Sequence, residues 1–259
     1  MTESSAESPR IAVAIPCYNE AAAVATVIAQ WRAALPDAEI VIFDNNSTDG
    51  TGAIARALGV RVIDVRAQGK GHAVRAIFAT LADREAVVMV DGDGTYPAEE
   101  VGLLLAPILD GKADMTVGAR RPVAEAGAMS PLRGLGNVLI RSAFRLLIGP
   151  GPGDLLSGYR VFGRRFREGV ILRSSGFEIE TELASMAVAR GLRVDEFPVP
   201  YRPRIVGTVS KLNAFRDGGR ILATIAAQSL RLRPWRLPWL VASIFALGGL
   251  MAWAIVSRP

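Results

Sequence analysis

Cysteine and histidine are nearly absent from this sequence of 259 residues, which contains one of each, Cys17 and His72. A single cysteine cannot form an internal disulfide, so the sequence fits a reducing compartment. The same shortage argues against sites that need several histidine or cysteine ligands, as most zinc sites do.

The N-terminus also lacks the features of a signal peptide, because residues 1–9 have neither a basic start nor an apolar run. We expect these residues to form a disordered lead-in.

The C-terminal end has no charged residue from Leu237 to Val256, a stretch of 20 residues that is long enough to cross a bilayer as a helix. Arginines precede this stretch, and Trp235, Trp239 and Trp253 lie near its ends. This pattern predicts a single-pass C-terminal transmembrane anchor with the preceding domain on the cytoplasmic face of a membrane. The alternative is a buried core helix.

The net charge is +5, from 30 basic and 25 acidic residues. A basic balance suits nucleic acids, phosphorylated substrates or an anionic membrane surface, and does not choose among them. The arginines concentrate toward the C-terminal end, and no nucleic-acid-binding module is recognisable, so we do not expect a nucleic-acid partner.

Short apolar runs alternate with segments of helical pattern through the first half of the chain. The runs that we interpret as strands are residues 11–15, 40–43, 60–65, 86–90 and 115–118. Such alternation predicts an α/β fold with a mostly parallel, Rossmann-like sheet and helices on both faces. We expect a catalytic domain at 10–210, a juxtamembrane amphipathic helix at 211–236 and the anchor at 237–256.

Polar clusters follow the predicted strands at residues 16–20, 44–51, 91–96 and 120–121. In open parallel sheets, ligands bind at the carboxyl ends of the strands, so these clusters predict one shared site. Asp91 and Asp93 can bind a hard divalent cation, with diphosphate oxygens completing its shell. The intervening Gly92 lets the backbone approach a ligand closely. The alternative is an ordinary turn between strand and helix.

Two earlier clusters contain candidate nucleoside contacts. Tyr18 can pack on a base, and Glu20 and Asp44 can accept hydrogen bonds from a base or a ribose. The alternative interpretation makes Asn19 the N-cap of the next helix and Asp49 a cap of the one after it.

The ordered motifs PCYNE, DNNSTDGT, GKG, DGDGTYP and GAR resemble those of the inverting family 2 glycosyltransferases, which have the GT-A fold. The later segments DLLSGYR, SGFEIETEL and RIVGTVSKLNAFRDG resemble one branch of that family, the polyprenyl-phosphate sugar synthases, of which dolichol-phosphate mannose synthase is a member. The resemblance covers about Ile11 to Ile221.

The resemblance implies roles for the residues that match these motifs. Nucleotide binding falls to Pro16, Tyr18, Glu20, Asp44, Lys70, Asp91 and Gly92. The metal ion, Mg²⁺ or Mn²⁺, would be bound by Asp91, Asp93 and Thr95. Thr95 stands at a position where the family often has a glutamine. The acceptor phosphate would be bound by Arg120, Arg133, Asn137 and Ser157. The diphosphate would be bound by Arg204, Ser210 and Lys211. The catalytic residues among them are Asp93, Arg120 and Lys211. For each arginine taken alone, a solvated surface charge is the alternative.

These assignments predict a metal-dependent inverting transfer of a hexose from UDP- or GDP-hexose to a polyprenyl phosphate at a membrane. A lipid phosphate is largely a dianion near neutral pH and needs no general base. A lipid hydroxyl such as that of diacylglycerol would need one, for which Asp154, Glu178, Glu180 and Glu182 are available. A nucleotidyltransferase would carry a glycine-rich segment where PCYNE stands. A non-catalytic membrane scaffold is disfavoured because Asp91, Asp93, Arg204 and Lys211 are all present.

Overall fold

The computed structural model describes residues 10–122, 131–209, 211, 214–236 and 238–239 of the chain. Its centre is one seven-stranded sheet with the strand order β3-β2-β1-β4-β6-β5-β7. The first four strands are β1 (Ile11–Cys17), β2 (Glu39–Asp44), β3 (Arg61–Asp64) and β4 (Ala86–Met89). They lie parallel, as the apolar runs predicted.

The other half of the sheet contains β5 (Met115–Pro122), β6 (Arg160–Gly163) and β7 (Val194–Tyr201). β7 is parallel to β5, whereas β6 runs antiparallel to both β4 and β5. The sequence analysis did not predict β6, because a strand of four residues shows too little periodicity to be recognised.

Helices cover both faces of the sheet, as predicted. One face carries α1 (Val24–Ala34), α2 (Thr51–Ala57), the short 3₁₀ helix η1 (Ala98–Glu100) and α4 (Val101–Leu109). The opposite face carries α3 (Lys70–Thr80), α6 (Arg164–Gly169) and α7 (Ile179–Ala189). Alternate residues of β1 serve the two faces: Val13 and Ile15 pack with α1, and Ala12 and Ala14 pack with α3.

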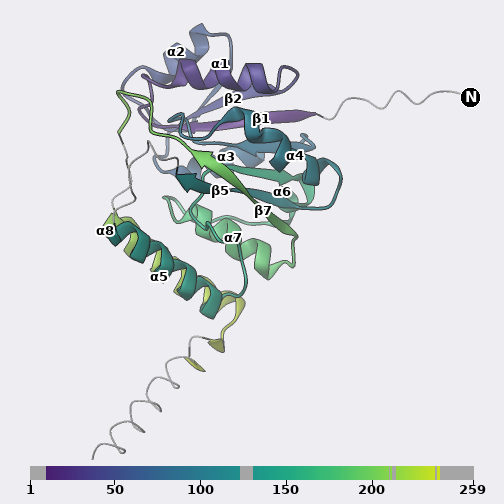
Figure 1. Cartoon of the computed structure of the whole chain (residues 1–259), viewed down its shortest axis with the longest axis vertical. Helices are drawn as coiled ribbons and strands as arrows, with labels where there is room; N and C mark the ends of the chain where they lie inside the picture. The colour runs from purple at the N-terminus through teal and green to yellow at the C-terminus, as the bar shows by residue number, and fades with distance from the viewer. Residues whose placement is uncertain (1–9, 123–130, 210, 212–213, 237, 240–259) are drawn as a thin grey trace, which may run out of the picture.

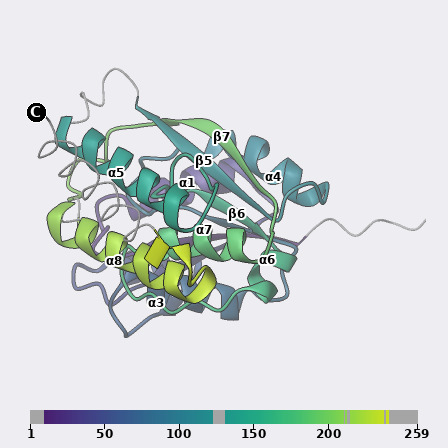
Figure 2. The same ribbon diagram turned by 90° about the horizontal axis from the view of Figure 1, so that it is seen from below.

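Two amphipathic helices, α5 (Pro131–Leu147) and α8 (Ala214–Leu232), form a further layer outside α7. Ile140 and Phe144 of α5 share a small core with Ile221 and Ile225 of α8 and with Ala184 of α7. Figure 1 shows the two helices side by side at the end of the molecule opposite α1 and α2, and Figure 2 views the same layer from below.

The predicted membrane anchor requires a correction. Within the described part of the chain, no helix combines the length and the apolar character needed to cross a membrane. The helix α8, near the end of the described part of the chain, ends at Leu232 and carries Asp217 and several arginines, so it is amphipathic rather than apolar. Apart from Pro238 and Trp239, the expected anchor at 237–256 lies outside the described residues, as do 1–9 and Ser210. A single-pass C-terminal anchor is therefore not supported.

Candidate active site

The loop after β1 brings Glu20 to the carboxyl edge of the sheet. Its side chain is buried, and Oε1 accepts a hydrogen bond from Nζ of Lys211 at 3.0 Å. The second carboxylate oxygen is buried without a hydrogen-bond partner among the described residues. Burial raises the pKa of Glu20, and the ammonium group of Lys211 opposes that rise. Tyr18 and Pro16 lie partly exposed at the same edge.

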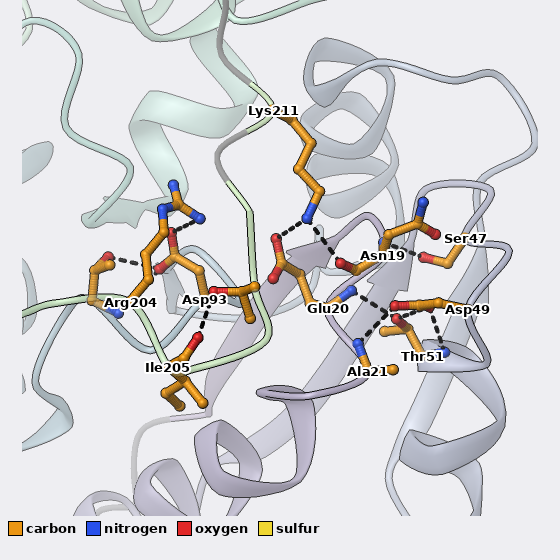
Figure 3. Close-up of polar contacts among 12 residues, drawn as sticks. Asn19, Glu20, Ala21, Ser47, Asp49, Thr51, Asp93, Arg204, Ile205 and Lys211 are labelled. Carbon is orange, nitrogen blue, oxygen red and sulfur yellow. Dashed lines mark hydrogen bonds and ion pairs between the residues drawn. The ribbon is translucent and has the colours of Figure 1, made fainter.

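The loops after β1 and β2 are tied together by side chains, as Figure 3 shows. Asn19 Oδ1 accepts from the backbone N–H of Thr48 at 2.8 Å, and Asp49 Oδ2 accepts from that of Ala21 at 2.9 Å. The alternative of a helix cap is wrong for Asn19, which has a left-handed backbone (φ 54°) and lies well before α1 begins at Val24. It holds for Asp49, whose Oδ1 accepts from the backbone N–H of Thr51, the first residue of α2, at 3.0 Å.

Asp44 ends β2 within the same group of loops and is buried at their base. Its Oδ1 accepts from the backbone N–H of Ser47 at 3.0 Å. A side chain at Gly52 would collide with its other oxygen, so glycine is needed where α2 passes this carboxylate. Glu20 and Asp44, the two predicted nucleoside acceptors, therefore lie on neighbouring strand ends.

The turn after β4 holds Asp91 and Asp93 in different surroundings. Asp91 Oδ1 accepts from Nζ of Lys70, at the start of α3, at 2.5 Å. Asp93 is buried, and its Oδ1 accepts from the backbone N–H and the hydroxyl of Thr95 at 3.0 and 2.7 Å. Gly92 is required because a side chain there would lie 2.6 Å from Sγ of Cys17. Thr95 thus fixes the orientation of the Asp93 carboxylate through these two hydrogen bonds.

Lys70 is buried between two carboxylates. Besides Asp91, it contacts Oε1 of Glu180 in the first turn of α7 at 2.6 Å. Burial alone would lower the pKa of Lys70, but the two carboxylates outweigh burial and raise it. The opposite holds for Glu180, where burial raises the pKa more than Lys70 lowers it. From the sequence, Glu180 was predicted only as a possible general base, and its contact with Lys70 was not predicted.

The segment after β7, described at residues 202–209 and 211, folds back over the strand ends and brings two more cations. Arg204 Nη1 contacts Asp93 Oδ2 at 2.7 Å, and Lys211 Nζ reaches the backbone oxygen of Asn19 at 2.8 Å as well as Glu20. Figure 3 shows both side chains entering the site from this one segment. Arg204 and Lys211 were predicted to bind the diphosphate together with Ser210, and the structure brings these two cations to Asp93 and Glu20.

The predicted acceptor residues are placed differently. Arg120, on β5, donates through Nε and Nη2 to both oxygens of Asp154 at 2.7 Å, and its guanidinium lies over the ring of Tyr201. Burial would raise the pKa of Asp154, but Arg120 outweighs it and lowers that pKa. The charge of Arg120 is therefore already balanced by a neighbouring carboxylate.

Ser157 is fully buried, and its hydroxyl donates to the backbone oxygen of Gly118 at 2.6 Å. Tyr96 links Ser157 to the turn after β4. The hydroxyl of Tyr96 lies 3.3 Å from Ser157 Oγ and accepts a hydrogen bond from the backbone N–H of Gly158 at 3.0 Å. In this arrangement Ser157 supports the site from inside. The contact of Tyr96 with Ser157 was not predicted from the sequence, although Tyr96 directly follows the Asp-Gly-Asp-Gly-Thr segment.

The remaining predicted acceptor residues, Arg133 and Asn137, both lie on α5. Asn137 is partly exposed, and the side chain of Arg133 is outside what the structure describes. For Asn137, no contact with the strand ends is recorded among the described residues.

The carboxylates Asp91 and Asp93 provide the oxygen ligands that Mg²⁺ and Mn²⁺ prefer. Across the described residues, no three His, Cys, Asp or Glu side chains converge on one point. Mg²⁺ is commonly held by one or two carboxylates and completes its shell with water and substrate phosphates. The pair therefore fits a cation that arrives with a diphosphate, and does not form a metal centre made of protein ligands alone.

The family profile described as "Glycosyl transferase family 2" matches residues 12–165, more than half of the chain and all of the strand-end loops from Tyr18 to Asp154. The chain belongs to glycosyl transferase family 2. As a family 2 glycosyltransferase it is an enzyme that transfers a sugar, and its strand-end carboxylates and cations lie within the matched region or in the segment that folds over it.

Curated relatives of this family 2 glycosyltransferase include proteins from archaea and bacteria. Glycosyltransferase AglJ of Haloferax volcanii is 38% identical over 211 residues, which cover 82% of this chain and 69% of the relative. The dolichyl-phosphate hexose transferase of the same organism is 35% identical over 86% of this chain and 95% of its own length. The polyprenol monophosphomannose synthase of Mycolicibacterium smegmatis is 32% identical over 79% and 81%.

Solved structures show the same fold at lower identity. Glucosyl-3-phosphoglycerate synthase from Mycobacterium tuberculosis, in complex with Mg²⁺ and uridine diphosphate, superposes with a TM-score of 0.65 at 23% identity and covers 86% of this chain and 79% of its own. Its complex with Mn²⁺ and UDP-glucose gives a TM-score of 0.62 at 22% identity over 86% and 79%. This likeness confirms the GT-A-like fold of the family 2 glycosyltransferase.

Proposed function

We propose that this enzyme transfers a hexose from a nucleotide-sugar to a polyprenyl phosphate, with inversion and with the help of Mg²⁺ or Mn²⁺. The observation that carries the proposal is the placement of Arg204 and Lys211 over Asp93 and Glu20. Cations and carboxylates alternate along the strand ends, which suits a nucleotide whose nucleoside needs acceptors and whose diphosphate needs cations.

The donor half of the reaction follows from these residues. Glu20 and Asp44 accept hydrogen bonds from the nucleoside, and Lys211 and Arg204 neutralise charge that grows on the leaving diphosphate. A divalent cation bound through Asp93 would add further electrophilic assistance there. Because these groups act most strongly on the charge that develops as the sugar departs, they raise the rate of transfer rather than only the affinity for the donor.

The lipid phosphate is supported by two relatives whose names specify dolichyl-phosphate and polyprenol-phosphate chemistry. It is also supported by exposed apolar side chains on the α5–α8 layer, which suit contact with an acceptor's hydrocarbon chain; they are Val138, Leu139, Leu146 and Leu230. A phosphate dianion attacks without a general base, and Arg120 is the cation on that side of the site.

The second candidate is transfer to a lipid hydroxyl such as that of diacylglycerol. It is favoured by Glu180, a buried carboxylate beside Asp91 and Lys70 whose Oε2 has no hydrogen-bond partner among the described residues and whose pKa is raised chiefly by burial. Those are the properties of a general base, which a hydroxyl acceptor requires.

The test is a transfer assay in detergent with radiolabelled UDP-glucose, UDP-galactose or GDP-mannose, offered with undecaprenyl phosphate, dolichyl phosphate or diacylglycerol. We expect a lipid product that releases its sugar in mild acid, because a glycosyl phosphate is acid-labile. An acid-resistant glycolipid formed from diacylglycerol alone would replace the first candidate by the second. Omission of Mg²⁺ and Mn²⁺ should abolish product formation.

A further inference from the structure

Asp93 already has a cation on the oxygen that a metal would need. Its Oδ1 is bound by the backbone N–H and hydroxyl of Thr95, and its Oδ2 contacts Arg204 Nη1 at 2.7 Å. The Thr95 contacts belong to the turn itself and hold the carboxylate in place. A divalent cation can therefore bind Asp93 readily only where the guanidinium of Arg204 now lies.

Arg204 can leave that position without unfolding the segment that carries it. The segment is fixed to the turn by its backbone, since Arg202 N–H donates to the Thr95 oxygen at 2.9 Å and Ile205 N–H donates to the Asp93 oxygen at 3.3 Å. The side chain of Ile205 packs against Gly94, where a Cβ atom would lie 2.5 Å away. The side chain of Arg204 is 33% exposed and can swing on this fixed base.

Lys70, the partner of Asp91, is not free to move in the same way. Its side chain is only 11% exposed and also neutralises Glu180, whose side chain is 3% exposed. If Lys70 moved away, Glu180 would remain as a buried carboxylate without its cation, which is strongly unfavourable. Of the two ion pairs at this turn, only the one between Asp93 and Arg204 is readily exchanged.

We propose that Arg204 is a replaceable internal counter-ion at Asp93, so that the enzyme binds a divalent cation together with a nucleoside diphosphate and only weakly without it. A metal ion alone must expel Arg204 and leave its charge beside the new cation. A diphosphate supplies negative oxygens that accept Arg204 and at the same time complete the shell of the metal ion. By linkage, each ligand then raises the affinity for the other. This inference rests on the nucleotide-sugar donor proposed above.

Binding of Mn²⁺ tests the proposal through electron paramagnetic resonance of the free ion, with MnCl₂ alone and with UDP or GDP. We expect the wild type to bind Mn²⁺ at least about tenfold more tightly with nucleotide than without it, a coupling of about 1.4 kcal/mol. In Arg204→Gln, the affinity for Mn²⁺ alone should rise about tenfold, and the coupling should become smaller without vanishing, because the diphosphate still completes the shell of the metal ion.

Arg202→Gln is the matched control, because it removes the same charge from the same segment but from an exposed pair with Glu99. It should leave the affinity for Mn²⁺ alone and the coupling unchanged. Adding Asp93→Asn to Arg204→Gln should cancel the gain, which would place the bound Mn²⁺ at Asp93. Thermal melting should show that all four proteins are folded.

Tight binding of Mn²⁺ to the wild type without nucleotide would overturn the counter-ion proposal, as would equal behaviour of Arg204→Gln and Arg202→Gln. If neither UDP nor GDP binds, the nucleotide-sugar donor is wrong, and the affinities of the wild type and Arg204→Gln for Mn²⁺ alone still decide the role of Arg204. The two failures are therefore distinguishable.

Discussion

The proposed donor and acceptor sides of this site are built in different ways. On the proposed donor side, Glu20, Asp91 and Asp93 each face a cation from a distant part of the chain, and the segment after β7 supplies two of these cations. On the acceptor side, Arg120 is held by both oxygens of Asp154, and Ser157 is sealed in the interior. The donor side thus combines the exchangeable contact of Arg204 with the fixed contact of Lys70, whereas the contacts of Arg120 and Ser157 on the acceptor side are fixed.

This difference indicates how the two substrates are handled. A nucleotide can exchange its phosphates for the carboxylates that now hold Arg204 and Lys211, so we propose that the donor binds by substitution of ion pairs. An acceptor phosphate meets a guanidinium whose orientation is already set by Asp154 and by the ring of Tyr201. We infer that Arg120 acts as a pre-oriented cation, for which little ordering is needed on binding.

The largest effect is expected from Asp93→Asn. Loss of this carboxylate removes the proposed metal ligand and leaves Arg204 without its partner, so transfer should fall by at least about a hundredfold. Sugar transfer to polyprenyl phosphate measures the rate, and circular dichroism checks the fold. Asp110→Asn, in an exposed pair with Lys112, is the control and should keep full activity. Activity of Asp93→Asn near the wild-type level, or undiminished turnover in EDTA, would show that the donor side does not use metal.

A smaller and more selective effect is expected from Arg120→Lys. Lysine keeps the charge but cannot form the two-pronged contact with Asp154, so the cation loses its fixed orientation. We expect the KM for the lipid phosphate to rise about tenfold, while the KM for the nucleotide-sugar changes little. Arg121→Lys, at the exposed neighbouring position, should alter neither value. An equal rise in both KM values would mean that Arg120 holds the whole site together and does not serve the acceptor alone.

The donor side could be predicted from the sequence because its residues directly follow strands. Parallel strands bring their carboxyl ends to one edge, so the positions of Glu20, Asp44 and Asp93 followed from the order of apolar runs. The acceptor side could not be predicted in this way. Ser157 precedes β6, an antiparallel strand of four residues that the sequence did not reveal, and its burial depends on contacts with Gly118 and Tyr96 from distant segments.

The partners of charged groups were also beyond the reach of sequence patterns. The resemblance suggested that Lys70, Arg204 and Lys211 serve phosphates, yet it contained nothing about which carboxylates they contact in this structure. Contacts such as that between Lys70 and Glu180 join residues 110 positions apart and depend on how α7 packs on α3. Periodicity predicts which face of an element is buried, but it does not predict which buried charges meet.

The smallest effects concern stability against pH, and they should have opposite signs on the two sides. Arg120 lowers the pKa of Asp154 in the folded state, so Asp154 stabilises the fold above its unfolded pKa of about 3.9, and this contribution is lost as pH falls through the lower folded pKa. Asp154→Asn should therefore cost about 1 kcal/mol at pH 7, and this cost should shrink as pH falls through the folded pKa of Asp154.

Glu20 has a raised pKa in the folded state, so its contribution is fully present below the unfolded pKa of about 4.3 and is lost as pH rises through the folded value. Relative to the wild type, Glu20→Gln should therefore gain stability as pH rises from 4 to 7, whereas the deficit of Asp154→Asn should stay nearly constant over that range and shrink only as pH falls below it. Urea unfolding at a series of pH values measures both slopes. Parallel slopes would mean that the two carboxylates have similar surroundings, and the contrast between the proposed donor and acceptor sides would not hold.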